Sequence, residues 1–195
     1  MAKRIITISR EFGSGGRFIG EEVAKKLGIA YYDKEMIGQI AEQAGLSSEY
    51  VRENAELSPK KGWFAYAFSG RDITGKSVED MVYEAQRKVI MEIAEKENCV
   101  IIGRNADFIL KDRKDVLNVF IHGSIPEKVR RICSLYNVTE VDAIKMINDI
   151  DKRRRTNYNF YTEQKWGMAG NYTLSLNSSV LGYDCLLYTS DAADD

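Results

Sequence analysis

A glycine-rich segment shortly after the first apolar run limits the possible folds of this chain more than any other feature. The β-branched run Arg4–Ser9 predicts a strand, and Gly13-Ser14-Gly15-Gly16-Arg17 follows three residues later. The next residues place apolar side chains on one helical face as far as Gly28, a residue typical of helix ends. Strand, glycine loop and helix in this order indicate a βαβ unit, and therefore a sheet of parallel strands.

The glycine-rich segment also has the chemistry of a phosphate cradle. Glycines let backbone N–H groups converge on an anion, and the N-terminus of the following helix adds its dipole. Arg17 adds a charge that can bind phosphate through two hydrogen bonds. We therefore predict that phosphate binds to Gly13, Ser14, Gly15, Gly16 and Arg17.

This segment departs from the usual phosphate-binding pattern, GxxxxGK[ST]. With the second glycine of the pattern on Gly15, Arg10 stands at the first glycine and Gly16 at the lysine. A shift by one residue puts Arg17 at the lysine and Glu11 at the first glycine. The lysine is absent in both registers, so we predict that Arg17 replaces it.

The hydroxyl that usually follows the lysine and helps to hold Mg²⁺ is missing as well. Ser9, Ser14 or a water is expected to supply that oxygen. The three cysteines are too widely spaced for a CxxC metal site, and His122 is the only histidine.

Strand and helix patterns alternate along the rest of the chain. Further strands are predicted over residues 29–32, 99–103 and 116–122. Helices are predicted to start at Ser77, after a capping box at Ser124, and after Thr139. We expect one α/β domain over residues 1–184, with a parallel sheet flanked by helices.

The alternation weakens between Ser47 and about Lys76, where a Pro-Lys-Lys-Gly segment precedes several aromatic residues. Two interpretations remain open for this excursion of about residues 47–76. It is either a surface loop packed by its own aromatics or a flap that binds substrate.

Composition excludes several classes of protein. The 195 residues carry 28 Lys and Arg against 29 Asp and Glu, with 44% hydrophobic and 29% charged residues. This balance is typical of a globular protein and does not favour nucleic acid as a partner. The apolar runs are far shorter than the ~20 residues that span a bilayer, and the first residues do not form a signal-peptide core. We expect a cytoplasmic protein with no membrane partner.

Arginines follow several predicted strands, where parallel sheets bind ligands. Arg104 comes directly after a buried strand and needs a partner that phosphate can provide. Arg154 follows Asp151 by one helical turn, so the carboxylate can orient it. The cluster Lys152–Arg155 also has a simpler interpretation, a solvated helix end whose dipole favours cations.

Several motifs together resemble the cytidylate kinase-like family, which is related to bacterial CMP kinases among the P-loop nucleoside-monophosphate kinases. The resemblance extends from about Lys3 to Tyr183. It rests on Ile-x-Ile-Ser-Arg-Glu-Phe-Gly-Ser-Gly-Gly-Arg, Tyr31-Tyr32-Asp33-Lys34, Val100-Ile101-Ile102-Gly103-Arg104, and Asp151-x-x-Arg154 followed by Tyr158 and Tyr161.

The resemblance implies a three-layer P-loop kinase fold and a set of site residues. Residues 13–17 would hold the ATP phosphates, and Asp33, Arg104 and Asn105 would face the acceptor. Lys34 and Glu35 replace the Ser-Gly of the CMP kinase pattern, and Asn105 replaces an Asp. The resemblance further implies a basic helix and a lid over about residues 151–165, whose phosphate-facing residues are Arg130, Arg131, Asp151 and Arg154.

The expected activity is ATP-dependent phosphoryl transfer to a nucleoside monophosphate, CMP or dCMP above others, with Mg²⁺ bound through ATP. Arg17, Arg104 and Arg154 are the expected catalytic residues, because phosphoryl transfer needs positive charge around the transferred group. Two alternatives remain open. The chain is a P-loop kinase for another small acceptor, or a nucleotide-binding regulatory protein without turnover. The oligomeric state is open too.

The final residues do not continue the family pattern. Residues 174–179 resemble the last strand of the family. Relatives have an amphipathic helix after that strand, whereas residues 185–195 show no helical apolar face. We expect the native sequence to stop near Asp184, with a non-native tail in place of the final helix.

Overall fold

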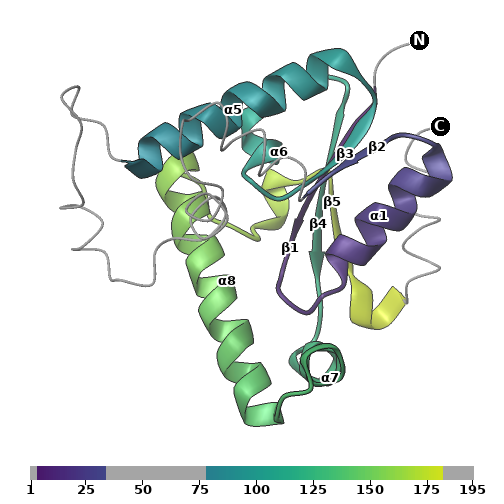
Figure 1. The fold of residues 1–195 in the computed structure, drawn as a ribbon, viewed down its shortest axis with the longest axis vertical. Helices are drawn as coiled ribbons and strands as arrows, with labels where there is room; N and C mark the ends of the chain where they lie inside the picture. Colours follow the sequence, from purple (N-terminus) through teal and green to yellow (C-terminus); the bar gives the residue numbers. More distant parts are fainter. Residues whose placement is uncertain (1–3, 34–77, 182–195) are drawn as a thin grey trace.

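The sheet of this protein is parallel throughout the part of the chain that the computed structural model describes, residues 4–33 and 78–181. It has five strands in the order β2-β3-β1-β4-β5 (Figure 1). Their bounds are β1 (Ile5–Arg10), β2 (Ala30–Tyr32), β3 (Cys99–Ile102), β4 (Val116–His122) and β5 (Leu174–Asn177). The parallel α/β architecture expected from the sequence is therefore confirmed.

The register of β1 decides where a ligand can meet the sheet. Ile8 of β1 lies opposite Ile102 of β3 on one side and Val119 of β4 on the other. Every residue of β1 is buried, as expected for the central strand of a covered sheet. The carboxyl ends of β1 and β3 therefore lie side by side, and the segments that follow them share one edge.

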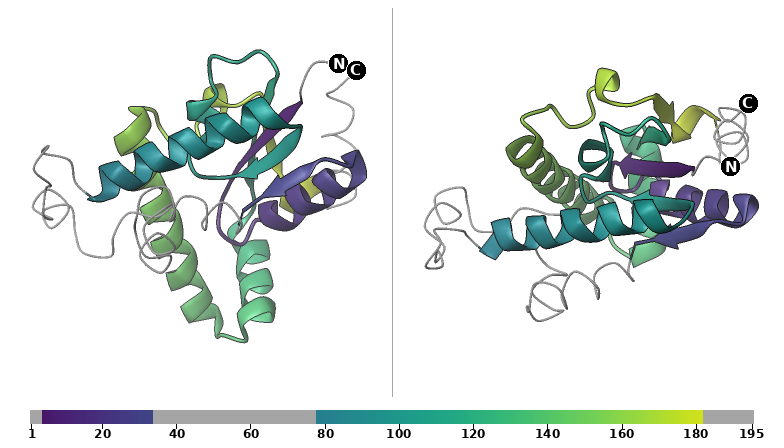
Figure 2. Two further views of the ribbon diagram at one scale, coloured as in Figure 1. Left: turned by 45° about the horizontal axis from the view of Figure 1, so that its top comes forward. Right: turned by 90° about the horizontal axis from the view of Figure 1, so that it is seen from above.

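Helices cover both faces of the sheet (Figure 2). The helical elements are α1 (Gly16–Leu27), α5 (Val78–Lys96), α6 (Ala106–Ile109), α7 (Ile125–Tyr136), α8 (Glu140–Thr162) and the short 3-10 helix η1 (Ala169–Asn171). One apolar cluster joins α1 to β1 and β3 through Ile19, Ile8 and Ile102. A second joins α5 to the opposite face through Ile90 and Ile101. This is the three-layer arrangement expected from the sequence.

Helices α7 and α8 pack together beyond the carboxyl edge of the sheet, and α8 then runs back towards α5 (Figure 1). Tyr161 near the end of α8 stacks on Tyr83 of α5, with ring centroids 4.1 Å apart. Phe12, between β1 and α1, packs against the α7–α8 cluster. The segment that follows β1 is thus in contact with α7 and α8.

The helix starts agree with the sequence, with one difference at a cap. The backbone N–H of Asp142 donates to Thr139 Oγ1 at 3.2 Å, which caps α8 as predicted. Ser124 is the N-cap residue of α7, but its side chain makes no capping hydrogen bond. Pro126, whose fixed φ suits a first turn, still marks the start of α7.

The basic cluster at residues 152–155 lies inside α8, which continues to Thr162. Its interpretation as a helix end is therefore wrong, because seven further residues are helical. Residues 151–162 of the expected lid belong to this same helix.

The excursion at 47–76 and the tail at 185–195 lie outside the described residues. None of the helices in residues 4–33 and 78–181 has the length and apolar character needed to cross a membrane.

Gly20 allows α1 to pack directly on the sheet, and this contact can be tested. A Cβ at position 20 would lie 2.4 Å from Ile102 Cδ1 and 3.0 Å from Ile8 Cδ1. Overpacking costs about 1–3 kcal/mol, against a helix-propensity gain of roughly 1 kcal/mol. Gly20→Ala should therefore lower the free energy of unfolding by about 1 kcal/mol, measured in urea. The matched control is Gly170→Ala, where nothing lies within 4 Å of the added Cβ. A Gly20→Ala variant more stable than wild type would contradict the packing.

Candidate functional site

The loop of residues 11–15, called here the phosphate loop, turns the chain from β1 into α1. Gly13 has φ 80° and Gly15 has φ 82°, values in the left-handed region that glycine adopts without strain. Gly15 is the N-cap of α1, so the first backbone N–H groups of that helix follow the loop directly. These N–H groups have no partner within a helix, which makes this end of α1 suitable for an anion.

A buried network of charges holds the phosphate loop from α7 and α8. The backbone N–H of Phe12 donates to Asp151 Oδ1 at 2.7 Å. Lys128 Nζ lies 2.8 Å from Glu11 Oε2 and 3.4 Å from Asp151 Oδ2, and the side chain of Lys128 is only 4% exposed. The loop is therefore fixed by side chains that are remote in sequence.

Burial raises the pKa of Asp151, whereas the Phe12 amide and the charges of Arg154 and Lys128 lower it. The carboxylate thus depends on its cations to stay ionised.

The two arginines of α7 that the sequence assigned to phosphate binding behave differently. Arg131 donates a hydrogen bond to the backbone oxygen of Gly13, so it contacts the phosphate loop. Arg130 is 72% exposed and pairs with Glu127 of its own helix. The structure brings Arg131 to the loop and leaves Arg130 at the surface.

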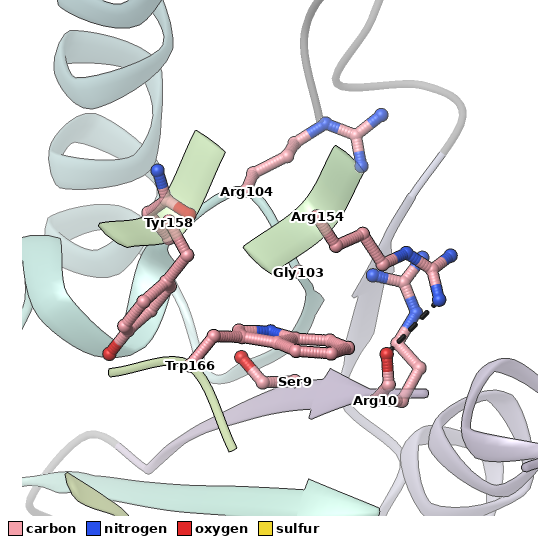
Figure 3. Close-up of a pocket in the computed structure, with 8 residues that line it drawn as sticks. Ser9, Arg10, Gly103, Arg104, Arg154, Tyr158 and Trp166 are labelled. Atoms are coloured by element: carbon pink, nitrogen blue, oxygen red, sulfur yellow. Dashed lines mark hydrogen bonds between the residues drawn. The ribbon is translucent and has the colours of Figure 1, made fainter. Parts of the chain in front are cut away.

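A pocket opens at the carboxyl ends of β1 and β3, beside α8 (Figure 3). Its lining combines three arginines with smaller polar groups and an indole ring: Ser9, Arg10, Gly103, Arg104, Asn105, Arg154, Tyr158 and Trp166. Nη1 of Arg154 donates to the backbone oxygen of Arg10 at 3.1 Å. The predicted pair Arg104 and Arg154 therefore does line one pocket, together with Arg10, which sequence reasoning missed as a site residue.

The turn after β3 is strained where it meets this pocket. Arg104 and Asn105 have φ values of 58° and 54°, in the left-handed region that costs non-glycine residues about 1–2 kcal/mol each. Gln86 of α5 donates to the backbone oxygen of Arg104, and Asn105 Nδ2 donates to Asn157 Oδ1 at 3.2 Å. Strained residues held by specific partners are typical of functional sites.

Asp33 joins two of the predicted arginines. Its Oδ1 lies 3.3 Å from Arg104 Nη1, and its Oδ2 lies 2.9 Å from Arg17 Nε. The side chain of Arg104 is 3% exposed, and its Nε has no hydrogen-bond partner among the described residues. The side chain of Arg17 is half exposed and does not line the pocket. Arg17 therefore lies against the predicted acceptor residue in this structure.

A buried carboxylate below the pocket was also missed from the sequence. Tyr158 donates its hydroxyl hydrogen to Asp107 Oδ2 at 2.7 Å, and Ser9 donates to Oδ1 at 3.3 Å. Burial raises the pKa of Asp107, and burial together with the nearby Asp107 charge raises that of Tyr158. The signal was present in the sequence, because Asp107 interrupts an otherwise apolar segment after the turn.

Of the two hydroxyls expected near Mg²⁺, Ser9 lines the pocket, whereas Ser14 is fully buried and donates to the Glu11 backbone oxygen at 2.8 Å. Within residues 4–33 and 78–181 no group of three His, Cys, Asp or Glu side chains is placed to hold a metal. Mg²⁺ usually binds one or two carboxylates together with substrate phosphates. Of the two hydroxyls, only that of Ser9 is placed where a Mg²⁺ ion bound together with phosphates would meet it.

Comparisons with known proteins identify the family and the fold. The model of the cytidylate kinase-like family matches residues 5–180. A search of curated proteins finds no match.

Among solved structures, an uncharacterised protein from Eubacterium ventriosum is similar, with 26% identity, a TM-score of 0.76 and 98% of each chain covered. Shikimate kinase from Bacteroides thetaiotaomicron has 17% identity and a TM-score of 0.57, again over 98% of each chain. Shikimate kinase from Acinetobacter baumannii, solved in complex with shikimate, has 14% identity and a TM-score of 0.54, over 99% of this chain and 93% of the other. The fold of this chain is that of the P-loop kinases.

The buried network gives a prediction about Lys128. Lys128→Met removes the cation between Glu11 and Asp151, which should cost about 3–5 kcal/mol of unfolding free energy at pH 7. The pKa of Asp151, already raised by burial, should rise further in the variant. The native state then binds protons more readily than the unfolded chain, so the deficit should shrink as the pH falls from 7 towards 5.

Urea unfolding of wild type and variant at both pH values measures this effect. The matched control is Lys145→Met, because the side chain of Lys145 is 73% exposed on α8. A deficit that is the same at both pH values would show that the carboxylates do not depend on Lys128.

Proposed function

The chain belongs to the cytidylate kinase-like family, and from this premise we propose that it transfers a phosphoryl group from ATP to a nucleoside monophosphate, with CMP or dCMP as the preferred acceptor. Family and fold together support the coarser statement, a P-loop kinase that binds nucleotides. The choice of acceptor is our own inference from the site.

The observation that carries this proposal is the pocket lined by Arg10, Arg104 and Arg154 beside the phosphate loop. Arginine binds phosphate oxygens through two parallel hydrogen bonds, and it keeps its charge in a buried site. A pocket with three arginines next to a helix N-terminus suits two phosphate groups that must approach each other despite their charges.

In the proposed reaction an oxygen of the acceptor phosphate forms a bond to the γ-phosphorus of ATP. The bond between that phosphorus and the oxygen bridging to the β-phosphate breaks, and ADP leaves with the electron pair. The acceptor oxygen is already anionic, so the step needs no general base. Catalysis rests on positioning and on stabilising the charge of the transferred group.

The residues divide this work between them. The backbone N–H groups of residues 13–17, with Arg17, hold the ATP phosphates. Arg104 binds the acceptor phosphate, while Asp33 and Asn105 shape its pocket. Arg154, oriented by Asp151, stabilises the transferred group and excludes water, with Arg131 against the loop.

Mg²⁺ bound to ATP would neutralise phosphate charge during the transfer. Ser9 is the hydroxyl we assign to it, with Asp107 holding Ser9 in place through the 3.3 Å hydrogen bond. Asp107 itself is 3% exposed, so its contribution to the ion is through Ser9.

Two other functions are suggested by residues that differ from the usual kinase motifs. Lys34 and Asn105 differ from the CMP kinase pattern, which favours a kinase for another small acceptor. The missing P-loop lysine favours a nucleotide-binding regulatory protein without turnover.

A coupled assay of ATP with a panel of nucleoside monophosphates and other small alcohol and phosphate acceptors separates the three functions. Turnover with CMP, dCMP or UMP alone supports the proposal. Turnover with a different acceptor supports the second function. Binding of ATP by calorimetry without turnover of any acceptor supports the third.

Two substitutions test the assignment of the pocket. Arg104→Met should lower kcat/KM for the acceptor by roughly 100-fold or more, because it removes a charge that contacts the acceptor phosphate. Arg154→Met should lower kcat by a similar factor with a smaller change in the KM of either substrate. Steady-state kinetics with both substrates varied measures these effects. The control is Arg87→Met, an exposed arginine on α5. Wild-type rates in either pocket variant would refute its assignment.

A further inference from the structure

We propose that Arg10 is a catalytic residue, and that it supplies the charge that a lysine supplies in the usual phosphate loop. This inference rests on the proposed function, because it names a group that contacts the transferred phosphoryl. It assigns the role of the lysine to Arg10 instead of Arg17, whose proposed contact with the ATP phosphates is a separate assignment.

The structure selects one of the two registers of the phosphate-binding pattern. Gly15 is the N-cap of α1 and has the left-handed conformation, and α1 begins at Gly16. In the usual pattern the lysine directly follows the second glycine where the helix starts. Gly15 therefore corresponds to the second glycine, Gly16 to the lysine and Arg10 to the first glycine. The other register would put the second glycine on Gly16, which already lies inside α1.

The side chain that is missing at position 16 and the side chain that is added at position 10 occupy the same space. A Cβ at Gly16 would lie 2.6 Å from Arg10 Cβ, closer than real Cβ atoms approach, and would also be crowded by Arg10 Cγ at 3.0 Å. The stem of Arg10 thus fills the volume from which a lysine at position 16 would start. The pattern has glycine where this chain has Arg10, and lysine where this chain has Gly16. These two differences therefore depend on each other.

Burial and position favour Arg10 over Arg17 as the cation. Arg10 is 8% exposed and lines the pocket, where its backbone oxygen accepts the 3.1 Å hydrogen bond from Arg154. Figure 3 shows the side chains of Arg10 and Arg154 on the same side of the pocket. The half-exposed Arg17 instead pairs with Asp33 and is not part of the lining.

The role of Arg10 involves no proton transfer. A guanidinium keeps its charge in a buried site and so serves as a fixed cation. It donates hydrogen bonds to oxygens of the phosphoryl group while that group passes from the β-phosphate of ATP to the acceptor. A guanidinium offers two parallel donors where a lysine offers one point charge.

The sharpest test puts glycine back at position 10 and lysine back at position 16. Arg10→Gly should lower kcat by roughly 100-fold or more and weaken the binding of inorganic triphosphate. Gly16→Lys alone should fold poorly, because its Cβ meets Arg10. The double variant R10G/G16K restores both glycines and the lysine of the usual pattern, with Arg17 still at the hydroxyl position, and it removes that clash, since the next atom, Ile121 Cβ, lies 3.4 Å away. It should regain at least about tenfold in kcat over Arg10→Gly, a coupling that independent sites do not show.

A conservative variant adds to this test. Arg10→Lys keeps a charge at the same position and should retain more activity than Arg10→Gly, with Arg87→Met again as the control. The inference is overturned if folded Arg10→Gly keeps wild-type kcat and triphosphate affinity. It is equally overturned if folded R10G/G16K and Arg10→Lys are both no better than Arg10→Gly.

Isothermal titration with inorganic triphosphate separates this inference from the proposed function. If the wild type phosphorylates no acceptor, the proposed function fails, and the titrations alone decide on Arg10. Weaker triphosphate binding in Arg10→Gly than in wild type supports the charge of Arg10 in the cradle. Equal binding overturns it.

Discussion

The buried carboxylate of Asp151 is the interaction on which the geometry of the site depends. One oxygen accepts the backbone N–H of Phe12, and the other faces Lys128, which also binds Glu11. Buried ion pairs gain little net free energy because desolvation opposes them, but breaking one leaves an uncompensated charge. The network therefore fixes the position of the phosphate loop more than it adds to stability. It also sets the position of α8 relative to β1.

Once α8 is held at Asp151, its following turns reach the other parts of the pocket. Arg154 contacts the end of β1, Asn157 contacts Asn105 in the turn after β3, and Tyr158 contacts Asp107 in α6. Net hydrogen-bond energies of about 0.5–1.5 kcal/mol each are enough to offset the strained backbone of that turn. The helix thus joins the phosphate loop to the predicted acceptor residues, and the strain at Arg104 is maintained by contacts with both α5 and α8.

The sequence predicted those parts of the structure that depend on local patterns. Apolar runs placed the first four strands to within one residue, Thr139 marked the start of α8, and arginines after strands led to the pocket. The last strand, β5, was predicted from the family resemblance. Lys128 was missed because its partners lie 117 and 23 residues away, and a lysine on an amphipathic helix normally faces solvent. Arg10 was noticed only as a mismatch in a pattern. The space it shares with Gly16 becomes visible only when the end of β1 and the start of α1 are placed together.

The same contacts bear on how the site closes around its substrates. Within the part of α8 assigned to the lid, Asp151, Asn157, Tyr158 and Thr162 are buried. Moving this helix as a rigid lid would break the contacts of Asp151 with both the phosphate loop and Lys128. Arg104 and Arg17 are different, because each is paired with Asp33 through its side chain, and a phosphate would compete for the same guanidinium groups. Substrate binding is therefore expected to proceed by re-pairing these arginines, while the network around Asp151 holds the loop and α8 in place.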